Sequence, residues 1–210
     1  MMGLKRILNQ LSSEDGFSLG EVMITAMLLG VMLAAAYLVQ STVASVSDGI
    51  IARNQAQLQG QLAIEKMTRE IRMAQVVTDG APNYNPYRLS QLGPTALSFY
   101  GDIDHNGHTD RVTYKLTNGI LYRSVCMSPK ASPIVSFTTD FGSDSSSTVL
   151  ASVSPSTTTV FTYLDNTGAS TTQQLSVCSV RITLSTVAKS GAATATVDFP
   201  AATADVRAFR

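Results

Sequence analysis

The clearest pattern in the chain is an uninterrupted apolar stretch near its beginning. Residues 17–39 read FSLGEVMITAMLLGVMLAAAYLV, and Glu21 is the only charged residue among them. At about 1.5 Å per residue, an α-helix of this length spans roughly 34 Å, which covers a bilayer core of about 30 Å. The stretch therefore predicts a transmembrane helix. It is long for a core helix, and its length and internal glutamate argue against a cleaved secretory signal.

From Gln40 to about Thr78 the pattern stays helical but becomes amphipathic. Apolar residues recur every three or four positions, first at Val43, Val46, Ile50, Leu58 and Leu62, and then at Ile64, Met67, Ile71 and Ala74. Because no proline occurs before Pro82, we expect one helix from about Phe17 to Thr78. Its second half, residues 40–78, forms a stalk whose apolar stripe we expect a sheet to cover.

Two glycines, Gly49 and Gly60, lie within the stalk half of this predicted helix. Each lowers helix stability by up to about 1 kcal/mol relative to alanine. We interpret Gly60 as a tolerated glycine, and we leave open whether Asp48-Gly49 breaks the helix.

Beyond Asp79 the pattern changes to short apolar and β-branched runs separated by turn residues, which predict strands. The predicted strands are Thr95–Tyr100, Arg111–Leu116, Ile120–Val125, Ile134–Thr138, Val160–Leu164, Val177–Val187 and Thr194–Phe199, with an edge strand at residues 205–210. Asn118-Gly119 predicts a tight hairpin turn, and the Ser/Thr-rich stretch from Ser143 to Thr159 predicts a surface loop. The expected fold class is α+β, with the long N-terminal helix packed against an antiparallel β-sheet head formed by residues 79–210.

The distribution of charge predicts an orientation in the membrane, and the charge balance and the motifs each argue against one functional class. Lys5 and Arg6 precede the apolar stretch, and the next basic residue is Arg53, so the N-terminus is expected in the cytoplasm and the head outside. Fifteen basic residues balance 15 acidic ones, which argues against a nucleic-acid partner. The chain has no nucleophile elbow, P-loop or dinucleotide fingerprint, and we expect no enzymatic activity and no catalytic residue.

Glu21 needs an explanation, because a carboxylate near the end of a membrane helix costs a few kcal/mol. One interpretation is that it lies at the level of the lipid headgroups and is merely tolerated. The other is that it pairs with a positive group on another chain. Its position alone does not separate the two interpretations.

The segment Gly16-Phe17-Ser18-Leu19-Gly20-Glu21-Val22-Met23-Ile24 resembles the class III signal of type IV pilins and of type II secretion pseudopilins. The resemblance implies that a prepilin peptidase removes residues 1–16 by cleaving after Gly16, and that Phe17 is then N-methylated. It also implies that Glu21 pairs with the N-terminal amine of a neighbouring subunit, since a charge pair is strong in a low dielectric. Gly20 departs from the family, which usually has a bulky aliphatic residue there.

Two further regions carry the resemblance more weakly. Residues 64–75 are similar to the stalk end of PilW-type minor pilins and of pseudopilin J, and residues 110–116, 119–123 and 180–184 resemble the head of PilW-type minor pilins. The resemblance implies a minor pilin of a Gram-negative bacterium, a single-pass inner-membrane protein with a periplasmic head that enters a type IV pilus and primes or caps it. The implied partners are the prepilin peptidase/methyltransferase, major and minor pilin subunits, the inner-membrane assembly platform and, before assembly, membrane lipid.

Two alternatives to this function remain. Within the class, the chain resembles pseudopilin J of a type II secretion system, where it would join a pseudopilus. Outside the class, it would be a single-pass anchored binding module such as an adhesin, with no cleavage at Gly16 and no filament.

An acidic segment in the head follows the D-x-[DN]-x-[DN]-G spacing of a calcium loop. Oxygen ligands at alternate positions converge on one Ca²⁺, and here they would be Asp102, Asp104, Asn106, the His108 carbonyl and Asp110. The twelfth position is Thr113 instead of glutamate, so this is no complete EF-hand. The alternative is a plain Asp/Asn/Gly-rich turn; apart from calcium we expect no cofactor.

The head also contains the chain's two cysteines, Cys126 and Cys178. Because the head is expected in an oxidising compartment, we predict a disulfide between them. In the chain-entropy model, closing a loop of this length stabilises the fold by roughly 4 kcal/mol. The alternative is two buried thiols.

Overall fold

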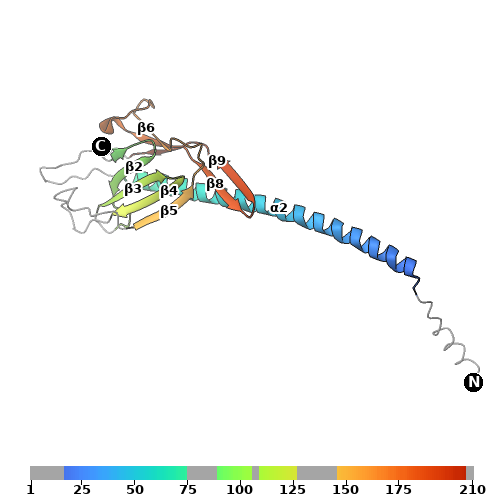
Figure 1. Ribbon diagram of the computed structural model, residues 1–210. Helices are drawn as coiled ribbons and strands as arrows, with labels where there is room; N and C mark the ends of the chain where they lie inside the picture. Colours follow the sequence, from blue (N-terminus) through green and yellow to red (C-terminus); the bar gives the residue numbers. More distant parts are fainter. Residues whose placement is uncertain (1–16, 75–88, 106–108, 127–145, 207–210) are drawn as a thin grey trace, which may run out of the picture. The chain divides into compact units, whose positions relative to one another are not determined.

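The computed structural model describes residues 17–74, 89–105, 109–126 and 146–206. The chain divides into two compact units, Met1–Ser47 and Asp48–Arg210. Helix α2 (Leu19–Arg72) begins in the first unit and ends in the second (Figure 1). The predicted single helix is confirmed through Asp48-Gly49, and it ends at Arg72, earlier than the predicted Thr78. Residues 75–78 lie outside the described residues.

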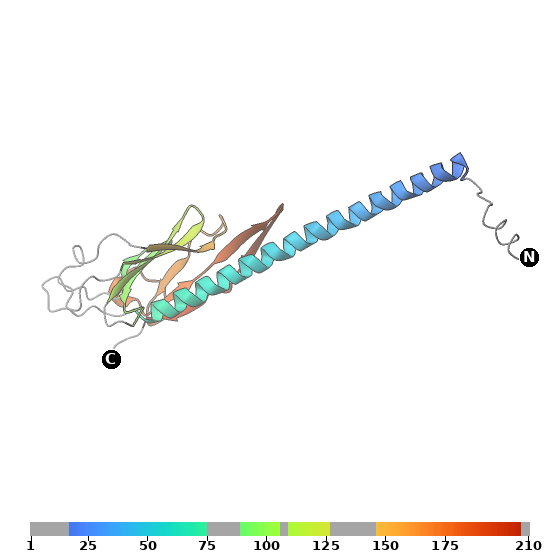
Figure 2. The ribbon, with the colours of Figure 1, turned by 90° about the horizontal axis from the view of Figure 1, so that it is seen from below.

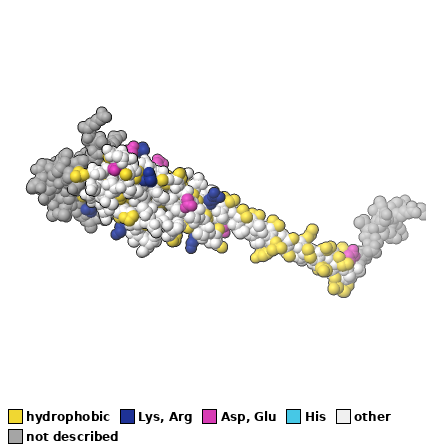
Figure 3. All heavy atoms as spheres, turned by 90° about the horizontal axis from the view of Figure 1, so that it is seen from above, with side chains coloured by type: hydrophobic (Ala, Val, Ile, Leu, Met, Phe, Trp, Pro, Cys, Tyr) yellow, Lys and Arg dark blue, Asp and Glu magenta, His cyan; other side chains and the backbone are white. Residues whose placement is uncertain are grey.

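In the first unit, every described side chain of α2 is exposed. Figure 3 shows hydrophobic side chains crowding this part of the helix. No described residue of this unit covers them, so these side chains are apolar without forming a protein core. They meet the length and composition of a membrane-spanning helix, which could anchor the chain by a single pass.

In the second unit, α2 buries a face made largely of small residues. Its buried residues are Ala52, Ala56, Gly60, Ala63, Met67, Glu70 and Ile71. The predicted stripe through Met67, Ile71 and Ala74 is therefore confirmed. The part of the stripe through Ile50, Leu58 and Leu62 is wrong, because each of these side chains is more than half exposed. Small residues are buried instead because they let the covering strands approach the helix backbone closely.

The first sheet of the head is an antiparallel meander of five strands in the order β1-β2-β3-β4-β5 (Figure 1). Its strands are β1 (Leu89–Leu92), β2 (Ala96–Gly101), β3 (Asp110–Thr117), β4 (Ile120–Cys126) and β5 (Ser146–Ser152). The predicted β3–β4 hairpin is confirmed, since Asn118 and Gly119 have φ angles of 51° and 74°, as a tight turn of this kind requires.

The remaining strands form two smaller antiparallel sheets. One has the order β10-β7-β6, from β10 (Ala202–Asp205), β7 (Ser179–Ile182) and β6 (Phe161–Leu164). The other is the hairpin of β8 (Ser185–Ser190) and β9 (Ala193–Asp198), and the short 3-10 helix η1 (Gln174–Ser176) precedes β7.

Three sequence predictions for the head are corrected. The predicted surface loop over Ser143–Thr159 is wrong for its middle, because Ser146–Ser152 pair with β4 as strand β5. The single predicted strand Val177–Val187 is two strands, β7 and β8, that belong to different sheets. The structure also adds β1, which the pattern did not predict. The predicted strand Ile134–Thr138 and the end of the predicted edge strand, residues 207–210, lie outside the described residues.

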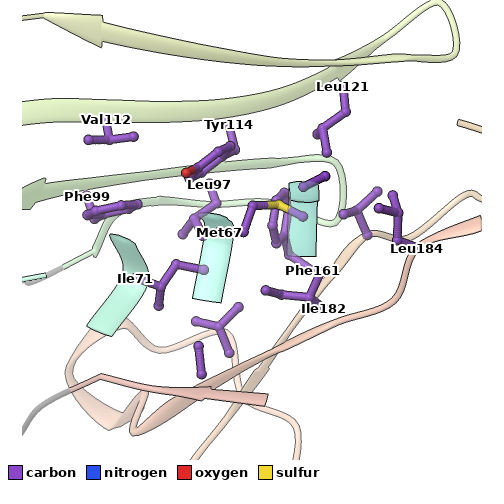
Figure 4. Packing of buried hydrophobic residues seen from close by; sticks show 14 of the residues in the cluster. Met67, Ile71, Leu97, Phe99, Val112, Tyr114, Leu121, Phe161, Ile182 and Leu184 are labelled. Carbon is purple, nitrogen blue, oxygen red and sulfur yellow. The ribbon is translucent and has the colours of Figure 1, made fainter. Parts of the chain in front are cut away.

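The core of the second unit forms where the end of α2 lies between two sheets. Met67 and Ile71 point into a cluster that contains Leu97, Phe99 and Tyr114 of the meander and Phe161 and Ile182 of the three-stranded sheet (Figure 4). All of these side chains are almost completely buried. The layout of one long helix and antiparallel sheets is α+β, as predicted.

Candidate functional site

Glu21 lies in the first turn of α2 and is exposed. Its backbone N–H donates to Ser18 Oγ at 3.2 Å and to the Ser18 carbonyl at 2.9 Å. Ser18 is therefore the N-cap, and Ser18-x-x-Glu21 has the sequence of a capping box. The helix dipole also favours a carboxylate in this turn.

This capping role was missing from the sequence interpretation of Glu21, although the Ser-x-x-Glu spacing is plain in the sequence. Phe17, the predicted methylation site, is 77% exposed. Gly16, the predicted cleavage site, lies outside the described residues.

Four hydroxyl side chains of the apolar helix donate hydrogen bonds to carbonyls of the helix itself. Thr25 Oγ1 donates to the carbonyls of Glu21 and Val22 at 2.9 and 3.0 Å, and Thr42 Oγ1 donates to the Leu38 carbonyl at 2.9 Å. Ser41 and Ser45 make similar bonds. Because these hydroxyls need no water as a partner, this part of α2 suits a low-dielectric surrounding.

The second unit also leaves an apolar line on α2 uncovered. Ile51, Leu58 and Leu62 are 42%, 59% and 57% exposed. Their spacings of seven and four residues place them on one face of the helix, which lies away from the buried small residues. Such a line suits packing against another helix.

A buried carboxylate connects the end of α2 to the meander. Glu70, 3% exposed, accepts the Tyr114 hydroxyl at 2.5 Å and pairs with Arg123 Nε at 2.8 Å, both through Oε2. Burial, and then the charge of Glu70, raise the pKa of Tyr114 far above its ordinary value. Burial opposes the charge of Arg123, but the hydrogen bond and charge of Glu70 leave its pKa raised. The arrangement holds charge in place and is structural.

The predicted calcium residues lie between β2 and β3. Asp102 is half-buried, Asp104 is exposed, and Asp110 is buried as the first residue of β3, paired with Gly101. Asn106 and His108 lie outside the described residues. Among the described residues, no group of three His, Cys, Asp or Glu side chains is placed to hold a metal ion. Calcium binding by this loop stays a prediction.

The predicted disulfide is not formed in the structure, which describes both cysteines. Cys126 is buried at the end of β4, where it pairs with Arg111 of the meander. Cys178 is exposed just before β7, beside the three-stranded sheet, and its thiol points to the Ser176 carbonyl at 3.7 Å. Cys126 lies in the five-stranded sheet, whereas Cys178 precedes a strand of the three-stranded sheet, and the pattern of the sequence could not reveal this separation.

The chain was also compared with known proteins. No family model matches it, and no curated protein matches it.

Proposed function

We propose that this chain is a minor pilin that is cleaved after Gly16, methylated on Phe17 and assembled into a type IV pilus, which it primes or caps. Its single helix would anchor it in the inner membrane with the head in the periplasm until assembly. Its partners would be the prepilin peptidase/methyltransferase, the assembly platform and other pilin subunits.

The observation that carries this proposal is the first part of α2. It is a continuous apolar helix that no described residue of its own unit covers, and Glu21 in its first turn is its only charge before Asp48. Such a helix needs a lipid bilayer or other apolar helices around it. A filament of parallel helices would supply the second environment, and it would place Glu21 close to the N-terminal amine of a neighbouring subunit.

The head contributes a second argument for helix packing. The exposed line through Ile51, Leu58 and Leu62 continues an apolar surface onto the part of α2 that the sheets cover on its other side. A simple membrane anchor has no use for such a line beyond the bilayer. Packing of neighbouring helices would remove it from water.

Mass spectrometry of sheared surface fibres and of the membrane fraction tests the proposal. The informative tryptic peptide runs from Phe17 to Arg53. We expect it N-methylated in fibres. Methylated peptide in the membrane alone would favour a type II secretion pseudopilin, and peptides in which residues before Gly16 remain joined to Phe17 would establish an anchored binding module instead.

Replacement of Glu21 tests the assembly step directly. We expect Glu21→Ala to reduce fibre number at least tenfold while cleavage and methylation of Phe17 continue, because the charge partner of the N-terminal amine is lost. Glu65→Ala, on an exposed position of the same helix, is the matched control and should leave fibre number unchanged. Normal fibres with Glu21→Ala would contradict the proposed pairing.

A further inference from the structure

One segment of α2 has a low intrinsic tendency to form a helix. Residues 41–51 read STVASVSDGII, and Ala44 is the only strong helix former among them. The residues before this segment are rich in alanine, leucine and methionine, and those after it in alanine and glutamine, which all favour a helix. Residues 41–51, which we call the weak segment, are therefore the part of α2 that opens most easily.

The weak segment also receives little support from packing, which supplies most of the stability of helices in proteins. The buried positions of α2 begin at Ala52, just beyond the segment. Residues 41–47 are exposed, as are Ile50 and Ile51. At Gly49 no described atom lies within 4 Å of where a Cβ would be, so no contact offsets the flexibility of this glycine.

The tip of the β8–β9 hairpin, residues 190–193, contacts this segment at Asp48. Ser190 Oγ donates to Asp48 Oδ1 at 3.2 Å, and a Cβ at Gly191 would overlap Asp48 Oδ2. The tip therefore lies directly against the Asp48 carboxylate. Within a helix, a free aspartate side chain competes for backbone hydrogen bonds. A carboxylate held by the tip is less able to do so.

The hairpin is anchored unequally along its length. At its base Thr186 is buried and donates to the Ala56 carbonyl at 2.7 Å. Near its tip Lys189 and Gly191 are exposed. A two-stranded hairpin has little stability of its own, and the tip is held to Asp48 by a single hydrogen bond between side chains. The tip can thus leave the helix while the base stays in place.

We propose that the contact between the hairpin tip and Asp48 controls local opening of α2 at Asp48-Gly49. While the tip holds the carboxylate, the weak segment stays helical. When the tip leaves, the Asp48 side chain bonds to nearby backbone groups, and the helix opens beside Gly49. Opening at this place is affordable because it lies outside the apolar stretch of residues 17–39, where water can bond to the freed backbone groups.

Amide hydrogen exchange of the full chain in detergent micelles tests this control, with mass spectrometry of peptides from residues 46–54. Ser190→Ala should speed exchange in these peptides at least threefold. Gly191→Asp should speed it further, because aspartate tolerates a positive φ while its Cβ and charge displace Asp48. Thr194→Ala removes a hydroxyl from an exposed position of the same hairpin, and as the matched control it should exchange like the native chain.

A second variant tests the weak point itself. Gly49→Ala should slow exchange of the same peptides by about fivefold, because alanine favours the helix and no described atom obstructs it. Combined with Ser190→Ala, it should return the exchange rate to the native value or below.

Three results would overturn the proposal. The first is unchanged exchange in both Ser190→Ala and Gly191→Asp, and the second is an equal effect of Thr194→Ala. The third is equally faster exchange in peptides from residues 110–126, which would mean that the whole head has loosened. The measurement does not depend on fibre assembly, so its failure leaves the proposed function standing.

Discussion

Glu70 shows how one residue can fix the position of a helix against a sheet. It is 3% exposed, and its charge is held by Arg123 of β4 and by the hydroxyl of Tyr114 of β3. These two partners face each other across the β3–β4 pair. Because an unpaired carboxylate in this place would be costly, the three residues specify one register between the end of α2 and the meander.

Replacing Arg123 should reveal the free-energy cost of burying the Glu70 carboxylate without a cation. We expect Arg123→Met to lower the free energy of unfolding by about 3 kcal/mol, because it leaves the buried Glu70 carboxylate without its cation. Urea unfolding of the full chain in detergent, followed by tyrosine fluorescence, measures the change. Arg181→Met, on an exposed position of β7, is the control and should change it by less than about 0.5 kcal/mol. Equal effects of the two variants would contradict the structural role.

The buried tyrosines predict a limit to stability at high pH. Burial raises the pKa of Tyr163 to about 12 and also raises that of Tyr114, where the charge of Glu70 adds to the effect. Well below pH 10 these phenols are neutral in both the folded and the unfolded chain, so they contribute no pH dependence there. Between pH 10 and 12 the unfolded chain ionises first, and the free energy of unfolding should fall.

Absorbance of tyrosinate at increasing pH, together with the melting temperature, checks this expectation. Tyr114→Phe should lessen the alkaline loss of stability, although it also removes a hydrogen bond and lowers stability at neutral pH. A melting temperature that stays constant from pH 9 to pH 12 would refute the prediction.

At the scale of elements, the β8–β9 hairpin contacts α2 through side chains that reach the helix backbone. Figures 1 and 2 show it lying along the helix. Thr186 Oγ1 donates to the Ala56 carbonyl at 2.7 Å in a buried position, and Ser190 Oγ lies 3.2 Å from Asp48 Oδ1. The ring of Phe199, which follows β9, lies directly against Gly60. The hairpin therefore braces the helix from Asp48 to Gly60.

Gly49 and Gly60, the two glycines of α2 in the second unit, should respond oppositely to alanine. Alanine raises helix propensity by about 1 kcal/mol at either position. At Gly60 a Cβ would overlap the Phe199 ring, so we expect Gly60→Ala to destabilise the head by about 1–3 kcal/mol. At Gly49 no described atom lies within 4 Å of the new Cβ, so Gly49→Ala should stabilise slightly. Thermal unfolding in detergent measures both, and stabilisation by both variants would show that the close contact does not matter.

These contacts explain which elements could be predicted from the sequence. Local signals were sufficient for α2, for the Asn118-Gly119 turn and for most strands, because each depends on a few neighbouring residues. The covered face of the helix could not be predicted between Asp48 and Leu62. Ala52, Ala56 and Gly60 are buried because their small size lets a hairpin from far along the chain pack against the helix. Leu58 and Leu62 fit the apolar pattern, but their side chains are exposed.

At the scale of the whole molecule, the chain contains two groups of apolar side chains, one buried in a core and one exposed. The second unit buries its apolar residues in its own core. The first unit exposes them, and its helix is long and apolar enough to cross a membrane. The sequence predicted this division because it depends on length and composition alone. Gly16 and Phe17 remain predictions from the resemblance.

The contact between the β8–β9 hairpin and α2 also affects the order in which the chain can fold during synthesis. Thr186 lies 130 residues after the carbonyl that it contacts. At about 5–20 residues per second, a ribosome takes roughly 6–26 s to add those residues. During this interval the small-residue face of α2 has been made but has no cover. The first part of α2, which is long and apolar enough to cross a membrane, is thus complete well before the hairpin that covers its other end has been made.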